Sequence, residues 1–121
     1  MKRIYLIILS IFLFTTNSFA STFINGFEDI PLMKELIQSK NEDFAFSNEE
    51  TGIIETKLTA KKKINFNDIK NFYRESLFQM GWNLKTETIE SISFYRENNV
   101  LDIQKIQNHP LKISISLKNR Y

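Results

Sequence analysis

Residues 65–82 read NFNDIKNFYRESLFQMGW, and this stretch decides the fold. Its mostly apolar and aromatic side chains recur every three or four residues, a spacing that places them on one face of an α-helix. The positions of this stripe are Ile69, Phe72, Tyr73, Ser76, Leu77 and Met80. The pattern therefore predicts a helix over residues 67–80 with this face buried.

Both ends of this helix carry boundary signals. Asn65 or Asn67 can cap the first turn, because a short polar side chain accepts a hydrogen bond from an otherwise unpaired backbone N–H group. Asp68 adds a negative charge near the positive end of the helix dipole. Gly81 follows the helix directly and can adopt the left-handed conformation in which many helices end. Trp82 then begins the next strand.

Four strands are predicted after the helix, and they follow one another through short turns. The expected ranges are 82–88, 92–96, 100–106 and 111–117. Asn98 and Asn99 suit a tight hairpin turn, because asparagine tolerates a positive φ. The last strand alternates strictly between apolar and polar residues, starting with Leu111 and Lys112. We therefore expect one face of the sheet to be buried and the other to face water.

Two further strands are predicted before the helix. Residues 53–58 alternate in polarity, and a polar loop over 47–52 joins them to the strand-like residues 44–46 in a hairpin. Upstream, Pro31 can begin a short helical turn over 31–38. We expect the apolar side chains of this turn to lie over the sheet.

The predicted order of elements is β-β-α-β-β-β-β. It describes an α+β fold in which an antiparallel sheet carries one long helix on one face. Beyond residues 1–20, we expect an amino-terminal extension over 21–43 and a single domain over 44–121. The chain has eleven phenylalanines and no cysteine, so a hydrophobic core without disulfides must stabilise it.

The first twenty residues have the pattern of a cleavable secretion signal. Lys2 and Arg3 precede an apolar run from Ile4 to Phe14, which is shorter than the roughly 20 residues that a membrane-spanning helix needs. Small residues at Ser18 and Ala20 favour cleavage after Ala20. We therefore predict export to the periplasm, with membrane contact only through this segment before cleavage. An uncleaved membrane anchor is the alternative.

Charge gives little indication of a nucleic-acid partner. The chain has 16 Lys and Arg against 14 Asp and Glu, and the loss of Lys2 and Arg3 with the signal leaves 14 of each. Phosphate binding requires a surplus of cations on one face. The only basic run, Lys61-Lys62-Lys63, is interpreted as a solvated connection. No nucleic-acid partner is predicted.

Three motifs carry a resemblance to a known group of proteins. They are FEDIPLM over 27–33, Phe46 followed by GIIE over 52–55, and FYRxxLxxxGW over 72–82, where x is any residue. In this order they resemble a group of short exported alphaproteobacterial proteins, rickettsial ones included. The resemblance implies export and an α+β fold. It implies no activity and no site residues.

Few residues suit catalysis or metal binding. His109 is the only histidine, and with no cysteine a zinc site would need carboxylates for nearly all its ligands. No serine lies in a G-x-S-x-G elbow, and the three glycines are isolated, so no phosphate-binding loop is predicted. The acidic pairs Glu28-Asp29, Glu42-Asp43 and Glu49-Glu50 are typical of solvated loops. We predict no catalytic residue, no cofactor and no metal.

One aromatic residue stands apart from the core pattern. Phe78 follows Ile69 by nine positions, which is about 180° around a helix, so it should face away from the buried stripe. Either the segment 27–37 covers it, or it belongs to a partner-binding surface. Tyr95 and Val100, on the outer face of the sheet, would extend such a surface if they cluster with it.

These observations favour a non-catalytic protein-binding module of the periplasm or envelope, with an envelope protein as partner. Two alternatives stay open. A carrier of small apolar ligands or lipid would need a cavity between helix and sheet. A carboxylate-dependent hydrolase would need convergent acids in a pocket, with Glu49, Glu50 or Asp102 as candidates.

Overall fold

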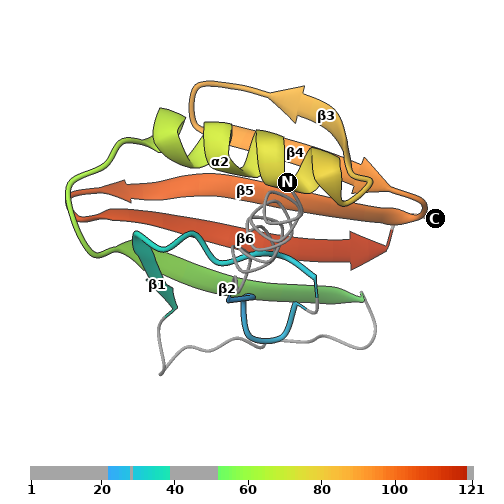
Figure 1. Cartoon of the computed structure of the whole chain (residues 1–121), viewed down its shortest axis with the longest axis horizontal. Coiled ribbons are helices and arrows are strands. Elements are labelled where there is room, and N and C mark those ends of the chain that lie inside the picture. The colour runs from blue at the N-terminus through green and yellow to red at the C-terminus, as the bar shows by residue number, and fades with distance from the viewer. Residues whose placement is uncertain (1–21, 28, 39–51, 120–121) are drawn as a thin grey trace, which may run out of the picture.

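The structure is a computed structural model that describes residues 22–27, 29–38 and 52–119. These residues contain one antiparallel sheet with a helix on one face (Figure 1). The elements are β1 Leu36–Gln38, β2 Ile53–Ala60, α2 Phe66–Gln79, β3 Asn83–Glu87, β4 Ser91–Arg96, β5 Asn99–Asn108 and β6 Leu111–Asn119. In space the strands follow the order β1-β2-β6-β5-β4-β3. The predicted α+β class, antiparallel sheet and single packed helix are confirmed.

Helix α2 begins and ends where its sequence signals predict. Asn65 and Asp68 form a capping box: the backbone N–H of Asp68 donates to Asn65 Oδ1 at 3.0 Å, and that of Asn65 donates to Asp68 Oδ2 at 3.1 Å. Gly81 lies just past the helix with φ of 91°. Of the predicted stripe, Ile69, Tyr73 and Leu77 are fully buried against the sheet.

The two faces of the sheet differ because side chains alternate along each strand. On the face under α2, one row across four strands consists of Thr56, Ile115, Ile103 and Ile92. The adjacent row on the opposite face consists of Glu55, Ser116, Asp102 and Ser93. The first face carries most of the core, and the second is polar, as the alternation in residues 111–117 predicts.

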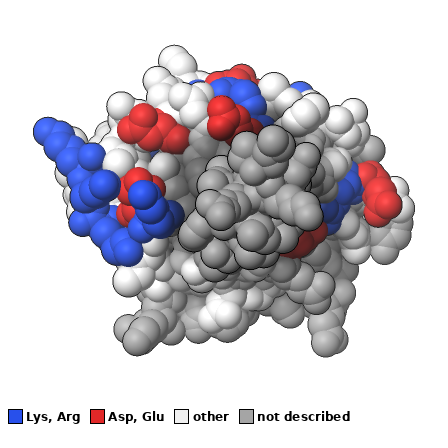
Figure 2. All heavy atoms as spheres, viewed as in Figure 1, with Lys and Arg blue, Asp and Glu red and all other residues white. Residues whose placement is uncertain are grey.

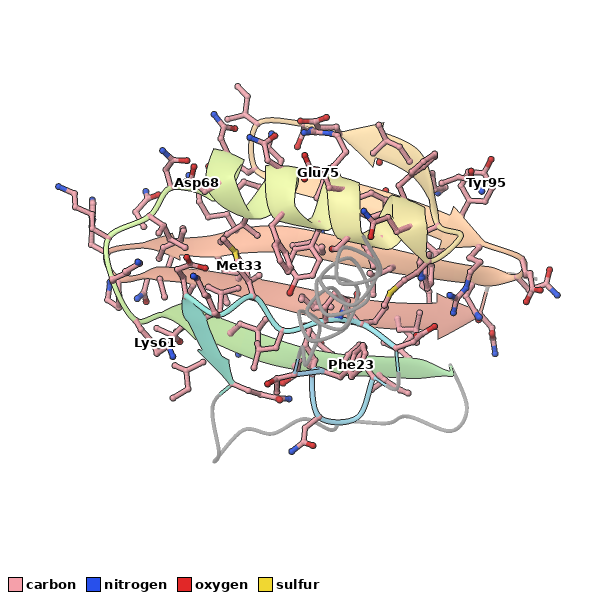
Figure 3. All side chains as sticks on the ribbon, viewed as in Figure 1. Phe23, Met33, Lys61, Asp68, Glu75 and Tyr95 are labelled. Atoms are coloured by element: carbon pink, nitrogen blue, oxygen red, sulfur yellow. The ribbon has the colours of Figure 1, made fainter. Side chains whose placement is uncertain are left out.

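The amino-terminal segment completes the core beside the helix. It crosses the sheet over β6 and β2, with Phe23 and Met33 along its course (Figures 1 and 3). Its buried apolar residues are Ile24, Phe27, Ile30, Met33 and Leu36. The hydroxyl group of Tyr73 in α2 donates to the Pro31 carbonyl at 2.7 Å, which fixes this segment to the helix. Residues 22–27 and 29–38 therefore belong to the same core as the rest of the chain.

The helical turn predicted over 31–38 does not form. Pro31 instead makes an antiparallel bridge with Phe23, a turn follows at residues 34–35, and Leu36–Gln38 is strand β1, paired with β2. The apolar spacing of this stretch also fits strand alternation, since Leu36 is buried and Ile37 exposed. The strand predicted over 44–46 lies outside the described residues.

Candidate functional site

Strand β3 and the carboxyl-terminal half of α2 form one exposed edge of the molecule, which we call the α2–β3 edge. β3 ends the strand order, and all five of its residues, Asn83–Glu87, are exposed. Helix α2 runs antiparallel to β3, because residues 80–82 turn the chain back beside the helix. The edge therefore combines a helix face with a strand that has no second neighbour among the described residues.

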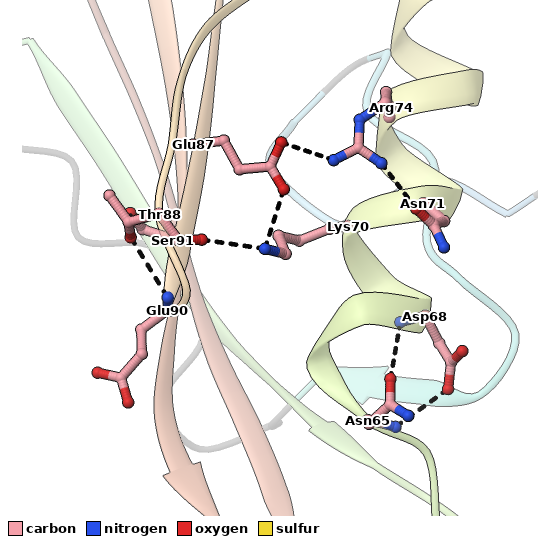
Figure 4. A network of polar contacts seen from close by, with 9 residues as sticks. All are labelled: Asn65, Asp68, Lys70, Asn71, Arg74, Glu87, Thr88, Glu90 and Ser91. Carbon is pink, nitrogen blue, oxygen red and sulfur yellow. Dashed lines mark hydrogen bonds and ion pairs between the residues drawn. The ribbon is translucent and has the colours of Figure 1, made fainter.

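A charged cluster fixes the helix to this strand (Figure 4). Glu87 of β3 accepts from Lys70 Nζ at 3.0 Å and from Arg74 at 2.7 Å. Lys70 is buried and also donates to the Thr88 carbonyl at 3.0 Å, so its ammonium group is well satisfied. Hydrogen bonding from Lys70, then from Arg74, lowers the pKa of Glu87 below its ordinary value. Glu87 is thus held as the anion.

Two large apolar side chains remain exposed at the other end of this edge. Phe78 lies one helical turn beyond Arg74 and is 73% exposed. Leu84 is 48% exposed and pairs with core residue Phe94, so it points to the side of the sheet that carries the helix. The antiparallel course of α2 and β3 places Phe78 and Leu84 at the same end of the edge. Segment 27–37 does not cover Phe78.

The structure does not bring Phe78, Tyr95 and Val100 together. Tyr95 and Val100 pair across β4 and β5 on the sheet face opposite α2, since their neighbours Phe94 and Leu101 face the core. Val100 is only 2% exposed, so its assignment to an accessible surface is corrected. Its in-register neighbours on that face are Tyr95 and Lys118, whose longer side chains flank it.

Three of the acidic residues that the structure describes bear on the alternative of a carboxylate-dependent hydrolase. Asp102 lies on the polar sheet face, 3.9 Å from Lys118, and Glu55 is two strands away, about 10 Å at the usual strand spacing. Asp29 pairs with Arg96 at 2.7 Å. Within residues 22–27, 29–38 and 52–119, no three histidine or acidic side chains gather as metal ligands do.

The other acidic candidates give no further support to a hydrolase. Glu28, the pair Glu42-Asp43 and the pair Glu49-Glu50 lie outside the described residues. His109 is exposed in the turn between β5 and β6. The helix–sheet interface, where a carrier would need a cavity, holds the buried side chains of Tyr73, Leu77 and Phe94.

One partly buried cluster was not foreseen from the sequence. The guanidinium group of Arg96 lies 4.5 Å from the centre of the Trp82 ring, and it donates to Asp29 at 2.7 Å and to the Met80 carbonyl at 3.0 Å. The indole Nε1 of Trp82 is buried without a hydrogen-bond partner in the described part of the chain. We interpret this cluster as structural, because its charges are paired.

Comparison of the chain with protein-family models, with curated proteins and with solved structures finds no significant match. The resemblance to short exported alphaproteobacterial proteins therefore stays a prediction. Among the described residues, no helix has both the length and the apolar character needed to cross a membrane.

Proposed function

We propose that this chain is an exported, non-catalytic protein-binding module whose partner docks on the α2–β3 edge. The observation that carries the proposal is the joint exposure of Phe78 and Leu84 at one end of this edge. Large apolar residues scattered singly on a surface need no explanation, whereas neighbouring ones mark interaction sites more often. Aromatic residues are also enriched at the centres of protein interfaces.

The position of Phe78 on α2 supports a role outside folding. The preceding residue, Leu77, is fully buried and already anchors this turn of the helix to the sheet. Phe78 therefore adds little to the core, and burial of its ring by a partner would contribute about 1.5–3 kcal/mol of binding free energy. Arg74 and Glu87, farther along the edge, would form a polar rim.

We infer that the partner contacts side chains rather than adding a strand to the sheet. β3 carries a bulge between Leu84 and Thr86, and Lys85 lies at this irregularity. Bulges and lysines on an edge strand both oppose pairing with another strand. The partner would therefore present a complementary apolar pocket or ridge to Phe78 and Leu84.

Export is the second component of the proposal. It rests on the basic start, the short apolar run and the small residues at Ser18 and Ala20. The absence of cysteine is compatible with an oxidising compartment, since no free thiol is exposed to oxidation there. The partner would then be a periplasmic or envelope protein.

Site-specific photo-crosslinking in cells tests both components together. A photoreactive phenylalanine analogue replaces Phe78 in the full chain, and in a control it replaces Ile37, an exposed apolar residue on the opposite edge strand β1. We expect one dominant crosslinked protein from position 78, its loss on Leu84→Asp in the same chain, and a mass that begins at Ser21. Equal crosslinking from both positions would contradict the assigned edge, and an uncleaved mass would contradict secretion by a cleaved signal.

A further inference from the structure

A second surface feature lies at the other end of helix α2. A groove of about 650 Å³ opens where the β2–α2 connection meets the turn between β5 and β6. Its lining includes Lys61, Lys62 and Lys63 from the connection, together with Lys105 and His109. We call it the basic groove. The start of α2 at Phe66 forms part of its wall, and Phe78 lies 12 residues farther on, about 18 Å along the helix axis.

The charge of the basic groove is largely uncompensated. Lys61, Lys62 and Lys63 are exposed and form no ion pair with any residue that the structure describes. The only carboxylate in its described lining is Asp68, whose Oδ2 accepts the Asn65 backbone N–H in the capping box. Figure 2 shows Lys and Arg side chains, with some Asp and Glu beside them, at the end of the molecule where Figure 3 places Lys61.

Lys105 extends the positive charge to the opposite wall. It pairs loosely with Glu90 at 3.6 Å, and the Glu90 side chain is largely exposed. A long ion pair to an exposed carboxylate is weak, so an anion in the groove can compete with Glu90 for the lysine. Lysines from two separate segments of the chain therefore line one hollow.

The floor and rim of the basic groove are apolar. Phe66 and Leu111 are nearly buried there, and Ile64 and Pro110 also line it. A ligand that fits would combine an anionic group with a less polar body. Several flexible ammonium groups act as point charges and suit a compact multivalent anion, whereas planar carboxylates are more often held by the fork of an arginine.

We propose that the basic groove binds a phosphate-bearing ligand. The phosphate would lie among Lys61, Lys62, Lys63 and Lys105, and the body of the ligand would lie against Ile64 and Pro110. The phosphate could belong to a membrane lipid headgroup or to a soluble phosphate ester, since both offer this chemistry. The proposal concerns a different surface from the α2–β3 edge, so either can fail without the other.

Titration followed by backbone amide NMR tests the site. The protein is expressed from the full sequence, and glycerol 3-phosphate is added at constant ionic strength. We expect saturable shifts at residues 61–66 and 105–111, and a Kd that rises about ten-fold or more when Lys61, Lys62 and Lys63 are all changed to Gln. The control variant changes Lys57, Lys85 and Lys118 to Gln, which removes the same charge elsewhere and should leave the Kd within about two-fold.

Vesicle binding separates the two sources of phosphate. Sedimentation with phosphatidylcholine vesicles containing phosphatidylglycerol, dependent on Lys61–Lys63, would support a lipid headgroup. Binding of glycerol 3-phosphate without vesicle binding would support a soluble ester. The proposal is overturned if neither probe binds saturably, or if both triple variants lose binding equally while their amide spectra show an intact fold.

Discussion

The guanidinium group of Arg96 forms a 2.7 Å ion pair with Asp29, a residue 67 positions earlier in the chain. The same group lies over the Trp82 ring and donates to the Met80 carbonyl. One side chain of β4 therefore holds three parts of the molecule: the amino-terminal segment, the end of α2 and the start of the following strand.

Arg96→Met should destabilise the fold by about 1–3 kcal/mol, because a cation over a buried indole and a hydrogen bond to a carbonyl are lost together. Urea denaturation followed by Trp82 fluorescence measures this change. Lys118→Met serves as the matched control. Lys118 is exposed, and its ion pair with Asp102 is long, at 3.9 Å. Equal stabilities for both variants would show that the Arg96 cluster contributes nothing.

Tyr73→Phe removes the hydrogen bond from the Tyr73 hydroxyl group to the Pro31 carbonyl. The Pro31 carbonyl is then left buried without this donor, so we expect a loss of about 1–2 kcal/mol in the free energy of unfolding. Ser76→Ala on the same helix is the control, because among the described residues the Ser76 hydroxyl group donates only to the Phe72 carbonyl of its own helix. A Tyr73→Phe variant as stable as the wild type would mean that this contact does not hold the segment.

Burial raises the pKa of Tyr73 well above the ordinary tyrosine range. Because the shift is upward, the neutral phenol is the form that the folded state favours. Absorbance titration should therefore show Tyr73 neutral at pH 11 in the folded protein, and ionising only as the protein unfolds in alkali. The difference between the wild type and a Tyr73→Phe variant identifies the Tyr73 signal. Ionisation of Tyr73 near pH 10 in the folded wild type would contradict its buried position.

Glu87 should make stability depend on pH in the acid range. Its pKa in the folded state is lowered from 4.5 by Lys70 and Arg74, so the stabilisation is fully present above pH 4.5. It is lost as the pH falls from there through the lowered pKa. Glu87→Gln should flatten this part of the stability curve relative to the wild type. The matched control is Glu75→Gln, which removes an exposed acid of helix α2 that forms no ion pair with any residue the structure describes.

Much of the fold could be predicted from residues close together in sequence. The capping pair Asn65 and Asp68, the buried stripe and Gly81 define α2 through contacts within a few positions, and local alternation defines the later strands. β1 was missed because the apolar spacing of residues 31–38 fits a helix as well as a strand. Only pairing with β2, about twenty residues away, decides between the two.

The two candidate surfaces likewise depend on contacts between residues that are far apart in the sequence. The exposed position of Phe78 follows from helix geometry, whereas Leu84 joins it only because β3 returns beside α2. Alternation correctly places Val100 on the outer face, but it cannot tell that taller neighbours flank it. In the sequence, the three lysines at 61–63 resemble a solvated connection. In the fold, the turn between β5 and β6 lines the same groove as these lysines.

Phe78→Asp should leave the free energy of unfolding within about 1 kcal/mol of the wild type, because the side chain is exposed and the only expected cost is a negative charge at the carboxyl end of the helix dipole. Leu77→Ala, one position earlier, should cost about 2–5 kcal/mol, since it empties a fully buried site. Thermal and urea unfolding of the two variants compare an exposed side chain with a buried one on the same helical turn. Unfolding of the Phe78→Asp variant would place this residue in the core.

The most direct test of the central proposal compares affinities for the partner that position 78 captures. Wild type, Phe78→Asp and Ile37→Asp are titrated against that purified partner by calorimetry. We predict that Phe78→Asp raises the Kd about ten-fold or more, the result expected when a buried aromatic contact is lost, while Ile37→Asp has no effect. An unchanged Kd for a folded Phe78→Asp variant would contradict the assignment of the α2–β3 edge as the binding surface.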